Sequence, residues 1–326
     1  MGPGINGSGF KHHPVLLGEA VHLLNPHPGA IMVDATLGGG GHAEAILQKI
    51  MPGGTLIGID VDPEALDAAR ERLKPFGKAF VAVLDNFANL QPVLAELGLQ
   101  RLDGILMDLG VSSHQLDRAE RGFSYQADVF LDMRMDPGLE QTATDLLGRL
   151  SREELTTLFK TLGEEKWSSR IASFIEAYRL QKGSITRSSQ LVEIIKQAIP
   201  ASSRRKGGHP AKRIFQALRM AVNRELDNLQ QGLQQGIASL KPGGRMVVIA
   251  YHSLEDGLVK RYFQELAQPC ICHPRFPVCQ CGRLPQVQWL TPKVIFPGAR
   301  EIQANPRARS ARLRTVEKLD AGSRKT

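Results

Sequence analysis

Long apolar runs are missing from this chain of 326 residues. No uninterrupted hydrophobic stretch approaches the ~18 residues that a membrane-spanning helix needs, so we expect no membrane partner. Residues 1–10 are rich in glycine and lack the apolar core of a secretion signal, which predicts an intracellular, cytoplasmic protein with a frayed start. Internal repeats and long low-complexity segments are also absent, so the chain is not built of repeats.

Cysteines are scarce and confined to one place. All four fall within twelve residues, as the pairs Cys270-x-Cys272 and Cys279-x-Cys281. In an intracellular protein such a cluster favours metal binding by thiolates over disulfides. The spacing differs from the usual C-x-x-C, so a structural zinc and plain thiols on a surface loop stay equal alternatives. Four thiolates would leave zinc no open position for water, which makes any such site structural.

The charge balance is positive and uneven. The chain is long enough for one large or two ordinary domains, and its 42% hydrophobic and 23% charged residues are ordinary for a soluble protein. The net charge of +8 is concentrated at Arg204–Lys206, at Lys212–Arg213 and at Arg307, Arg309, Arg312 and Arg314. Such clusters suit a phosphate backbone, although each alone could be a solvated face, so they favour a nucleic acid modestly. Monomer and homodimer stay equally open.

Alternating apolar runs and helical patterns indicate repeated βα units. We expect strands near residues 31–35, 55–60, 79–84 and 103–108, and a later one over 243–251. This order predicts an α/β fold with a parallel sheet and helices on both faces. More than a hundred residues separate the fourth strand from the later one, so the sheet domain is interrupted by an insertion.

The insertion has helical patterns throughout. Ser151-x-x-Glu154 predicts a capping box, and an apolar stripe from Trp167 to Tyr178 predicts a helix that ends at Gly183. A further helix is expected over about 189–199, and Pro210 at a first helical position should open a long helix running past Leu226, back to the sheet. The division is therefore a discontinuous domain, 1–112 with 209–326, around a helical domain over 113–208 that we expect to recognise RNA.

A glycine-rich turn follows the first expected strand. Residues 34–42 read Asp-Ala-Thr-Leu-Gly-Gly-Gly-Gly-His, between an apolar run and a helical pattern. Glycines allow a positive φ and a close backbone approach to a ligand at the N-terminus of a helix. The second expected strand ends at Asp60, 22 residues after Gly38, where a carboxylate can bind ribose hydroxyls. These features predict a nucleotide-like cofactor, and on their own they also fit an NAD-dependent oxidoreductase.

The fourth expected strand ends at Asp108, at the sheet edge where α/β proteins bind ligands. Methyltransferases that act on exocyclic amines carry an Asp or Asn there, followed by two prolines and an aromatic residue. The two prolines are absent here, because Asp108 is followed by Leu109-Gly110-Val111.

Longer motifs carry a specific resemblance. The chain resembles the RsmH family, also called MraW, of bacterial small-subunit rRNA cytosine-N4 methyltransferases, from about His12 to Arg314. The motifs that carry it are His13–Leu17, Asp34–His42, Asp108–Asp117, Glu120–Ser124, Leu131–Asp136, His209–Ala217, His252–Asp256 and Asn305–Ser310.

The resemblance implies a Rossmann-like class I fold that transfers a methyl group from S-adenosyl-L-methionine to N4 of cytosine 1402 of 16S rRNA in the small ribosomal subunit. It implies cofactor contacts by Gly40, Gly41, His42, Asp60, Phe87, Asp108 and Gln115. From the residues themselves, Asp60 suits the ribose diol, Phe87 can pack on adenine, and the Gly40-Gly41 backbone can approach the methionine end. His42 is expected to orient rather than to act as a base.

The cytosine amine is a poor nucleophile, so the enzyme must align it and accept hydrogen bonds from it. Asp108 and His252 are the catalytic candidates, although Asp108 is first a cofactor contact and His252 could equally be a packing residue. Phe123 and Tyr125 could stack on a flipped cytosine or simply pack their loop.

One segment departs from the family pattern. Val129-Phe130 stands where the family usually has Gly-Pro, which leaves the conformation of that loop open. The alternative functions are methylation of a DNA amine, and a non-catalytic RNA-binding factor in which the cysteine cluster binds metal.

Overall fold

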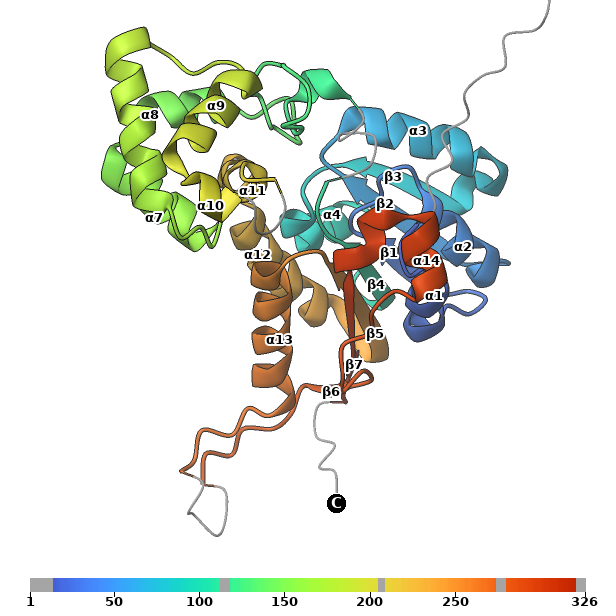
Figure 1. Ribbon diagram of the computed structural model, residues 1–326. Coiled ribbons are helices and arrows are strands. Elements are labelled where there is room, and N and C mark those ends of the chain that lie inside the picture. Colours follow the sequence, from blue (N-terminus) through green and yellow to red (C-terminus); the bar gives the residue numbers. More distant parts are fainter. Residues whose placement is uncertain (1–13, 112–117, 205–208, 274–279, 321–326) are drawn as a thin grey trace, which may run out of the picture.

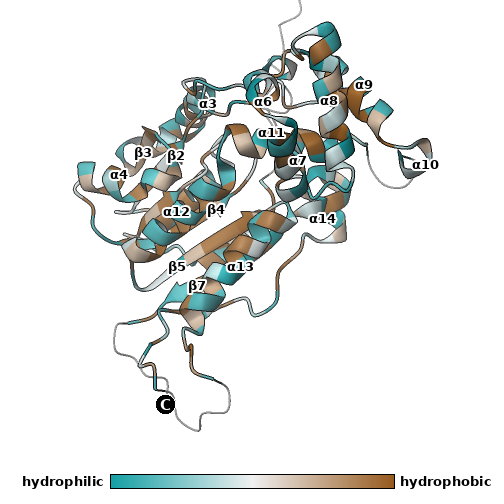
Figure 2. Ribbon diagram, turned by 90° about the vertical axis from the view of Figure 1, so that its left-hand side faces the viewer, coloured by the Kyte–Doolittle hydropathy of each residue, from teal (hydrophilic) through white to brown (hydrophobic). Residues whose placement is uncertain are grey.

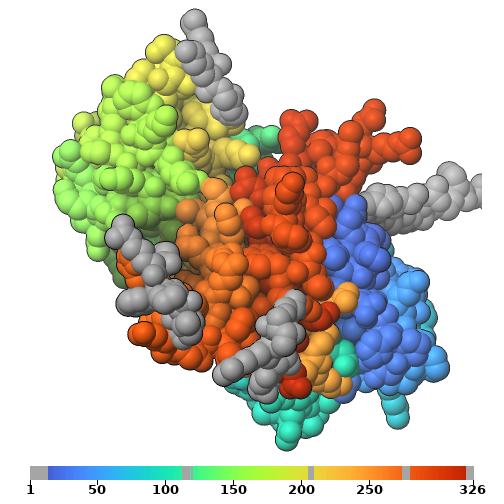
Figure 3. Space-filling model, turned by 90° about the horizontal axis from the view of Figure 1, so that it is seen from below, coloured from blue at the N-terminus to red at the C-terminus, as the bar shows by residue number. Residues whose placement is uncertain are grey.

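The computed structural model describes residues 14–111, 118–204, 209–273 and 280–320. These residues form a sheet with helices on both faces and a separate group of helices beside it (Figure 1). Seen from below, the C-terminal third of the chain lies between the helical group and the first βα units (Figure 3). None of the helices among the described residues is both long and apolar enough to cross a bilayer.

Five parallel strands make up most of the sheet, in the order β3-β2-β1-β4-β5. The first four lie within one residue of the expected ranges at each end, and the fifth begins three residues before its range. Their bounds are β1 Ile31–Asp34, β2 Thr55–Asp60, β3 Phe80–Leu84, β4 Leu102–Asp108 and β5 Leu240–Ala250. Helices cover both faces, which is why these strands are almost uniformly apolar in sequence.

Successive residues of each strand point to opposite faces, and each face has its own core. Met32 and Leu56 pack under one set of helices, whereas the next residues, Val33 and Ile57, pack under the other. The first set is α1 Leu17–Leu24, α2 Gly41–Ile50 and α3 Pro63–Leu73. The second set is α4 Leu90–Glu96, α12 Glu225–Ser239 and α13 Ser253–Ala267. Figure 2 shows the sheet strands as the most hydrophobic ribbons between them.

Two antiparallel strands extend the sheet beyond β5, and the sequence reading missed both. They are β7 Arg312–Lys318, which pairs with β5, and β6 Val287–Trp289 at the edge. Two arginines of the expected C-terminal basic cluster, Arg312 and Arg314, lie at the start of β7. Arg314 is buried and donates to both carboxylate oxygens of Asp256 at 2.6 and 3.2 Å, and Arg312 donates to Asp256 at 3.2 Å. Both charges serve folding.

The helical group has its own hydrophobic core. Its main helices are α6 Ala143–Arg149, α7 Arg152–Thr161, α8 Ser168–Lys182, α9 Ser188–Ala198 and α11 Lys212–Val222. The capping box of Ser151 and Glu154 is confirmed, and α8 buries Ile171 and Ile175 and ends at Gly183, as expected.

Shorter helices complete the described chain: η1 Lys74–Ala79, η2 Phe87–Asn89, η3 Ala119–Arg121, α10 Ala201–Arg204, α14 Ala299–Ala304 and η4 Pro306–Ser310. The division into 1–112 with 209–326 and 113–208 stays a prediction, and residues 112–117 and 205–208 at its boundaries lie outside the described ranges. The helical core includes α11 up to Val222, which favours a C-terminal end of this unit near the α11–α12 corner.

The long helix expected from Pro210 past Leu226 is wrong, because the chain turns between α11 and α12. Pro210 lies in a turn before α11, and Arg224 at the corner has a φ of +49°. The side chain of Asn223 accepts from the N–H of Met135 at 2.7 Å and donates to the carbonyl of Met133 at 2.8 Å. These bonds fix the corner. The helical spacing of apolar residues continues through it, so the sequence did not indicate that the helix ends there.

Candidate functional site

The carboxyl ends of the parallel strands open into a cleft of about 1610 Å³. Gly38, Asp60 and Asp108 line it from the sheet, and Tyr125 and Phe215 line it from the helical unit. A pocket for one drug-sized ligand measures roughly 300–1,000 Å³. This cleft therefore has room for two bound groups side by side, as a bimolecular group transfer requires.

The glycine turn between β1 and α2 forms one wall. Gly38 and Gly40 have φ values of +50° and +76°, a conformation that residues with a Cβ rarely adopt. Gly38, Gly39 and Gly41 line the cleft, whereas Gly40 packs against α3. A Cβ on Gly41 would collide with Pro14. The structure thus brings Gly41 to the cleft as expected and gives Gly40 a conformational role instead of a lining one.

Asp60 ends β2 beside this turn. Its carboxylate accepts from the N–H of Gly38 at 2.8 Å and from the N–H of Asp62 at 3.0 Å. Burial raises the pKa of Asp60 to about 6, against the lowering effect of these two bonds. Each carboxylate oxygen retains a lone pair, so Asp60 can still accept hydroxyl donors. Phe87, in η2, also lines the cleft, with its ring close against Gly232 of α12.

Asp108 ends β4 in the middle of the cleft. Its Oδ1 accepts from the hydroxyl of Tyr251 at 2.9 Å, and its Oδ2 lies 3.7 Å from Nδ1 of His42. Burial raises the pKa of Asp108 to about 7, which the Tyr251 hydrogen bond opposes and the charge of Asp34 reinforces. Nε2 of His42 lies 3.1 Å from the carbonyl oxygen of Val15, to which it must donate. His42 is thereby held in one orientation, and its expected role in orienting the reactants stays a prediction.

Asp34, at the end of β1, is a site residue that the sequence reading quoted but did not single out. It is 1% exposed, and burial followed by the charge of Asp60 raises its pKa to about 7, although a hydrogen bond from the N–H of Thr36 lowers it. Among the described residues its Oδ2 has no hydrogen-bond partner. Three carboxyl groups therefore meet here, those of the buried Asp34 and of the partly buried Asp60 and Asp108. Such a site favours a ligand that carries positive charge.

His252 lies directly after β5 and begins α13. Its Nδ1 accepts from the N–H of Glu255 at 3.3 Å, and its Nε2 lies 3.1 Å from Oε1 of Glu255. Glu255 is buried and also accepts from the N–H of Tyr251 at 2.9 Å. Burial alone would raise the pKa of Glu255, but the hydrogen bond from His252 and the nearby Arg219 bring it below its usual value. His252 thus caps a helix and lines the cleft at the same time.

Residues 9–319 match the sequence pattern of the MraW methylase family. The chain belongs to this family. Proteins named ribosomal RNA small subunit methyltransferase H are similar in sequence to this methylase over almost its whole length. The one from Symbiobacterium thermophilum is 51% identical over 313 residues, which cover 96% of this chain and 98% of the relative. The one from Geobacter sulfurreducens is 52% identical over 310 residues, which cover 95% and 99%.

A solved rRNA methylase from Streptococcus thermophilus is 11% identical, with a TM-score of 0.41, covering 93% of this chain and 94% of that one. That likeness is too loose to bear on function. Family membership makes this protein an α/β methylase, and S-adenosylmethionine is its methyl donor. The oxidoreductase alternative is therefore excluded. The cluster of carboxyl groups around the unpartnered Oδ2 of Asp34 fits this donor, which carries positive charge on sulfur and on its amino group.

The aromatic residues of the methylase take two different roles. Phe123 is 7% exposed and belongs to the core of the helical unit, which supports the loop-packing interpretation. The ring of Tyr125 stacks on His209, with centroids 4.6 Å apart, and meets Phe215 edge-on at 5.7 Å. Tyr125 and Phe215 line the cleft, so this cluster places an aromatic surface opposite the sheet edge.

The loop that departs from the family pattern is held against the start of α9. Arg187 donates to Oδ2 of Asp128 at 2.8 Å, and the N–H of Ser188 donates to the carbonyl of Val129 at 2.9 Å. Phe130 forms a β-bridge with Arg187. Two other expectations, Gln115 as a cofactor contact and Cys279 as a metal ligand, fall outside the described residues.

Proposed function

We propose that this protein transfers the methyl group of S-adenosylmethionine to N4 of cytosine 1402 of 16S rRNA in the small ribosomal subunit, in the cytoplasm. The names of the full-length relatives support a small-subunit rRNA substrate. The observation that carries the choice of an exocyclic amine is Asp108, a partly buried acceptor with a raised pKa in the lining of a cleft with room for two groups.

When bound, S-adenosylmethionine supplies an electrophilic methyl group on a positively charged sulfur. Asp60 would accept hydrogen bonds from its ribose hydroxyls, and Phe87 would pack on its adenine. The carboxyl groups of Asp34 and Asp108 would stabilise the positive charge of the donor. The turn at Gly38 and Gly41 allows the donor's methionine end to approach the backbone closely.

Asp108 also aligns the amine that receives the methyl group. The cytosine N4 shares its lone pair with the ring, and it becomes a better nucleophile when an acceptor binds one of its N–H groups. The transfer then releases one proton from N4, which the Asp108 carboxylate takes up. A pKa of about 7 suits this role, because the acceptor is partly ionised at neutral pH and still binds a proton well. The hydroxyl of Tyr251 keeps Oδ1 of Asp108 in place.

His252 is a second contact for the base. Its ring is oriented by Glu255, which in turn accepts from the N–H of Tyr251, so His252 and the Asp108–Tyr251 pair are fixed by one network. The network sits at the end of β5, next to the end of β4. His252 therefore positions the ring of the cytosine while Asp108 engages its N4.

The helical unit presents the target nucleotide. An enzyme that modifies a base takes it out of its stack and receives it on aromatic side chains. Tyr125 and Phe215 provide such a surface in the cleft, and Lys212, Arg224 and Arg307 surround it with positive charge for the phosphates. The methyl transfer thus takes place at the sheet edge, and the insertion with its neighbouring basic residues binds the RNA.

Methyl transfer from labelled donor tests the substrate class. We expect transfer to small subunits that lack the modification, weaker transfer to free 16S rRNA and none to duplex DNA. Transfer to DNA alone would favour the alternative of a DNA amine methyltransferase. Failure to bind S-adenosylmethionine in calorimetry would instead favour a non-catalytic RNA-binding factor.

A further inference from the structure

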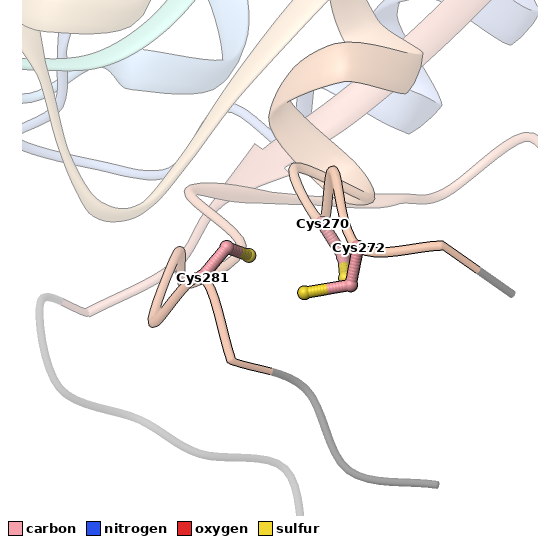
Figure 4. Close-up of side chains that lie close together, drawn as sticks. All are labelled: Cys270, Cys272 and Cys281. Atoms are coloured by element: carbon pink, nitrogen blue, oxygen red, sulfur yellow. The ribbon is translucent and has the colours of Figure 1, made fainter. Parts of the chain in front are cut away.

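Three cysteines from two separate segments meet outside the cleft. Cys270 and Cys272 follow the end of α13, and Cys281 comes shortly before β6. Their sulfur atoms all lie within 4.8 Å of one another. Figure 4 shows the three side chains directed toward a common space between the two segments.

Apolar packing does not explain why the three cysteine side chains lie together. Buried cysteines normally behave as small hydrophobic residues inside a core. Here Cys270 is exposed, and the neighbouring Ile271 and Leu284 are 67% and 46% exposed. The segments that carry the cysteines project away from the sheet as an extended arm (Figure 1). Among the described residues no hydrophobic cluster includes the three cysteines, so apolar packing does not account for their convergence.

The geometry suits one metal ion. Zinc binds thiolates at about 2.3 Å in a tetrahedron, which places neighbouring sulfur atoms roughly 3.8 Å apart. Separations within 4.8 Å approach this arrangement. The N–H of Gln280 also donates to Sγ of Cys272 at 3.2 Å, and such bonds stabilise the negative charge of a metal-bound thiolate.

We propose that Cys270, Cys272 and Cys281 bind a structural Zn²⁺ ion. On binding, each thiol releases its proton to solvent and forms one Zn–S bond, so one ion displaces up to three protons from these cysteines. The ion closes the arm between α13 and β6. It takes no part in methyl transfer.

The position of the site separates it from the cleft. The 15 residues of α13 run from Ser253, next to His252, to Ala267, and a helix of that length spans about 22 Å. The thiolates lie beyond the far end of this helix. Removing the metal should therefore loosen the arm and leave the binding of S-adenosylmethionine unchanged.

Metal analysis of the reduced full-length protein tests the site. We expect one zinc per chain by elemental mass spectrometry, and three thiols that become reactive only after a strong chelator removes the metal. Cobalt substitution should give the charge-transfer absorption of tetrahedral thiolate ligation. Calorimetry with S-adenosylmethionine, before and after chelation, should give the same affinity within about twofold.

Variants identify the ligands. Cys270→Ser and Cys281→Ser should each lower zinc affinity at least tenfold, whereas Ile271→Ala, an exposed neighbour between two ligands, should retain one zinc. His273→Ala should retain one zinc as well. Circular dichroism confirms that each variant is folded. Absence of zinc from reduced protein supplied with the metal, or full zinc content in both Cys270→Ser and Cys281→Ser, would overturn the proposal.

Discussion

At the scale of single residues, Asp108 has two tasks that its surroundings allow it to combine. Burial raises its pKa to about 7, and the Tyr251 hydroxyl fixes one of its oxygens. Its position after an apolar strand could be predicted from sequence. Its hydrogen bond to Tyr251 could not, because the two residues are 143 positions apart and meet only through the pairing of β4 with β5.

Asp108→Asn should slow methyl transfer by roughly 10²–10⁴-fold, the usual contribution of a general base. The amide can accept a hydrogen bond but cannot take up the proton. Single-turnover rates should rise with pH through about 7 in the wild type and stay flat in the variant. Calorimetry separates this effect from cofactor binding. Tyr251→Phe is the control and should shift the pH profile to higher pH with a smaller loss of rate. An unchanged rate in Asp108→Asn would remove the residue from catalysis.

Asp34 should make the stability of the ligand-free protein depend on pH. Its pKa is raised from 3.8 to about 7 on folding, so the folded state binds the proton more tightly than the unfolded state does. The stabilisation of the fold by the bound proton of Asp34 is complete below pH 3.8 and is lost as pH rises to about 7. Thermal unfolding of Asp34→Asn should lack this part of the decline, so the stability of the variant should rise relative to the wild type as pH goes from 3.8 to about 7. Parallel curves would show that Asp34 is not protonated in the fold.

At the scale of elements, the central strands could be predicted because their sequences are largely apolar. The edge strands could not be predicted because their sequences are more polar. β1 to β5 are covered on both faces, so their sequences stand out. The first residues of β7 alternate arginines with apolar residues, and both arginines pair with Asp256 from α13. The corner at Asn223 was equally hidden, because its hydrogen bonds reach Met133 and Met135, about 90 residues earlier. Partners of this kind depend on the tertiary fold.

Arg121 connects the loop of the helical unit to the sheet. It pairs with Asp62, which is fully buried, at 3.0 Å, and donates to the carbonyls of Arg134 and Met135 at 3.0 and 2.9 Å. Arg121→Ala should lower the free energy of unfolding by about 3 kcal/mol, because it removes the cation that pairs with a fully buried carboxylate. Hydrogen exchange should increase over residues 119–135.

Arg118→Ala is the matched control for this prediction. Arg118 pairs with Glu64 at 3.1 Å, but both side chains are more than 40% exposed. Loss of such a surface pair should cost less than about 1 kcal/mol. Equal effects of the two variants in denaturant unfolding would show that Arg121 is not a specific connection between the units.

At the scale of the whole molecule, the function depends on a cleft that neither unit forms alone. The sheet edge provides the acidic groups for the donor and the amine, and the helical unit with its neighbours provides aromatic and basic groups for RNA. Composition indicated a nucleic-acid partner, and the motifs indicated the family. The size of the cleft could not be predicted, because it depends on how α11 and the loop before α6 sit against the sheet.

Lys212 should contribute to RNA binding through its charge. It is exposed on the cleft wall, and each phosphate contact adds about 0.7 to the slope of log affinity against log salt for single-stranded RNA. Lys212→Ala should lower that slope by roughly 0.7 in filter-binding titrations with 16S rRNA. Lys49→Ala, an exposed lysine on α2 that is not part of the cleft lining, should leave it unchanged. Equal slopes in all three proteins would contradict a phosphate contact at Lys212.

The measurement that tests the central claim most directly is mass-spectrometric mapping of methylated nucleosides in small subunits lacking the modification, after incubation with the protein and isotopically labelled S-adenosylmethionine. The account predicts one labelled methyl group, on N4 of cytosine 1402 of 16S rRNA, and almost none with Asp108→Asn. A label at another nucleotide, on another atom of that cytosine, or at full level with Asp108→Asn would contradict it.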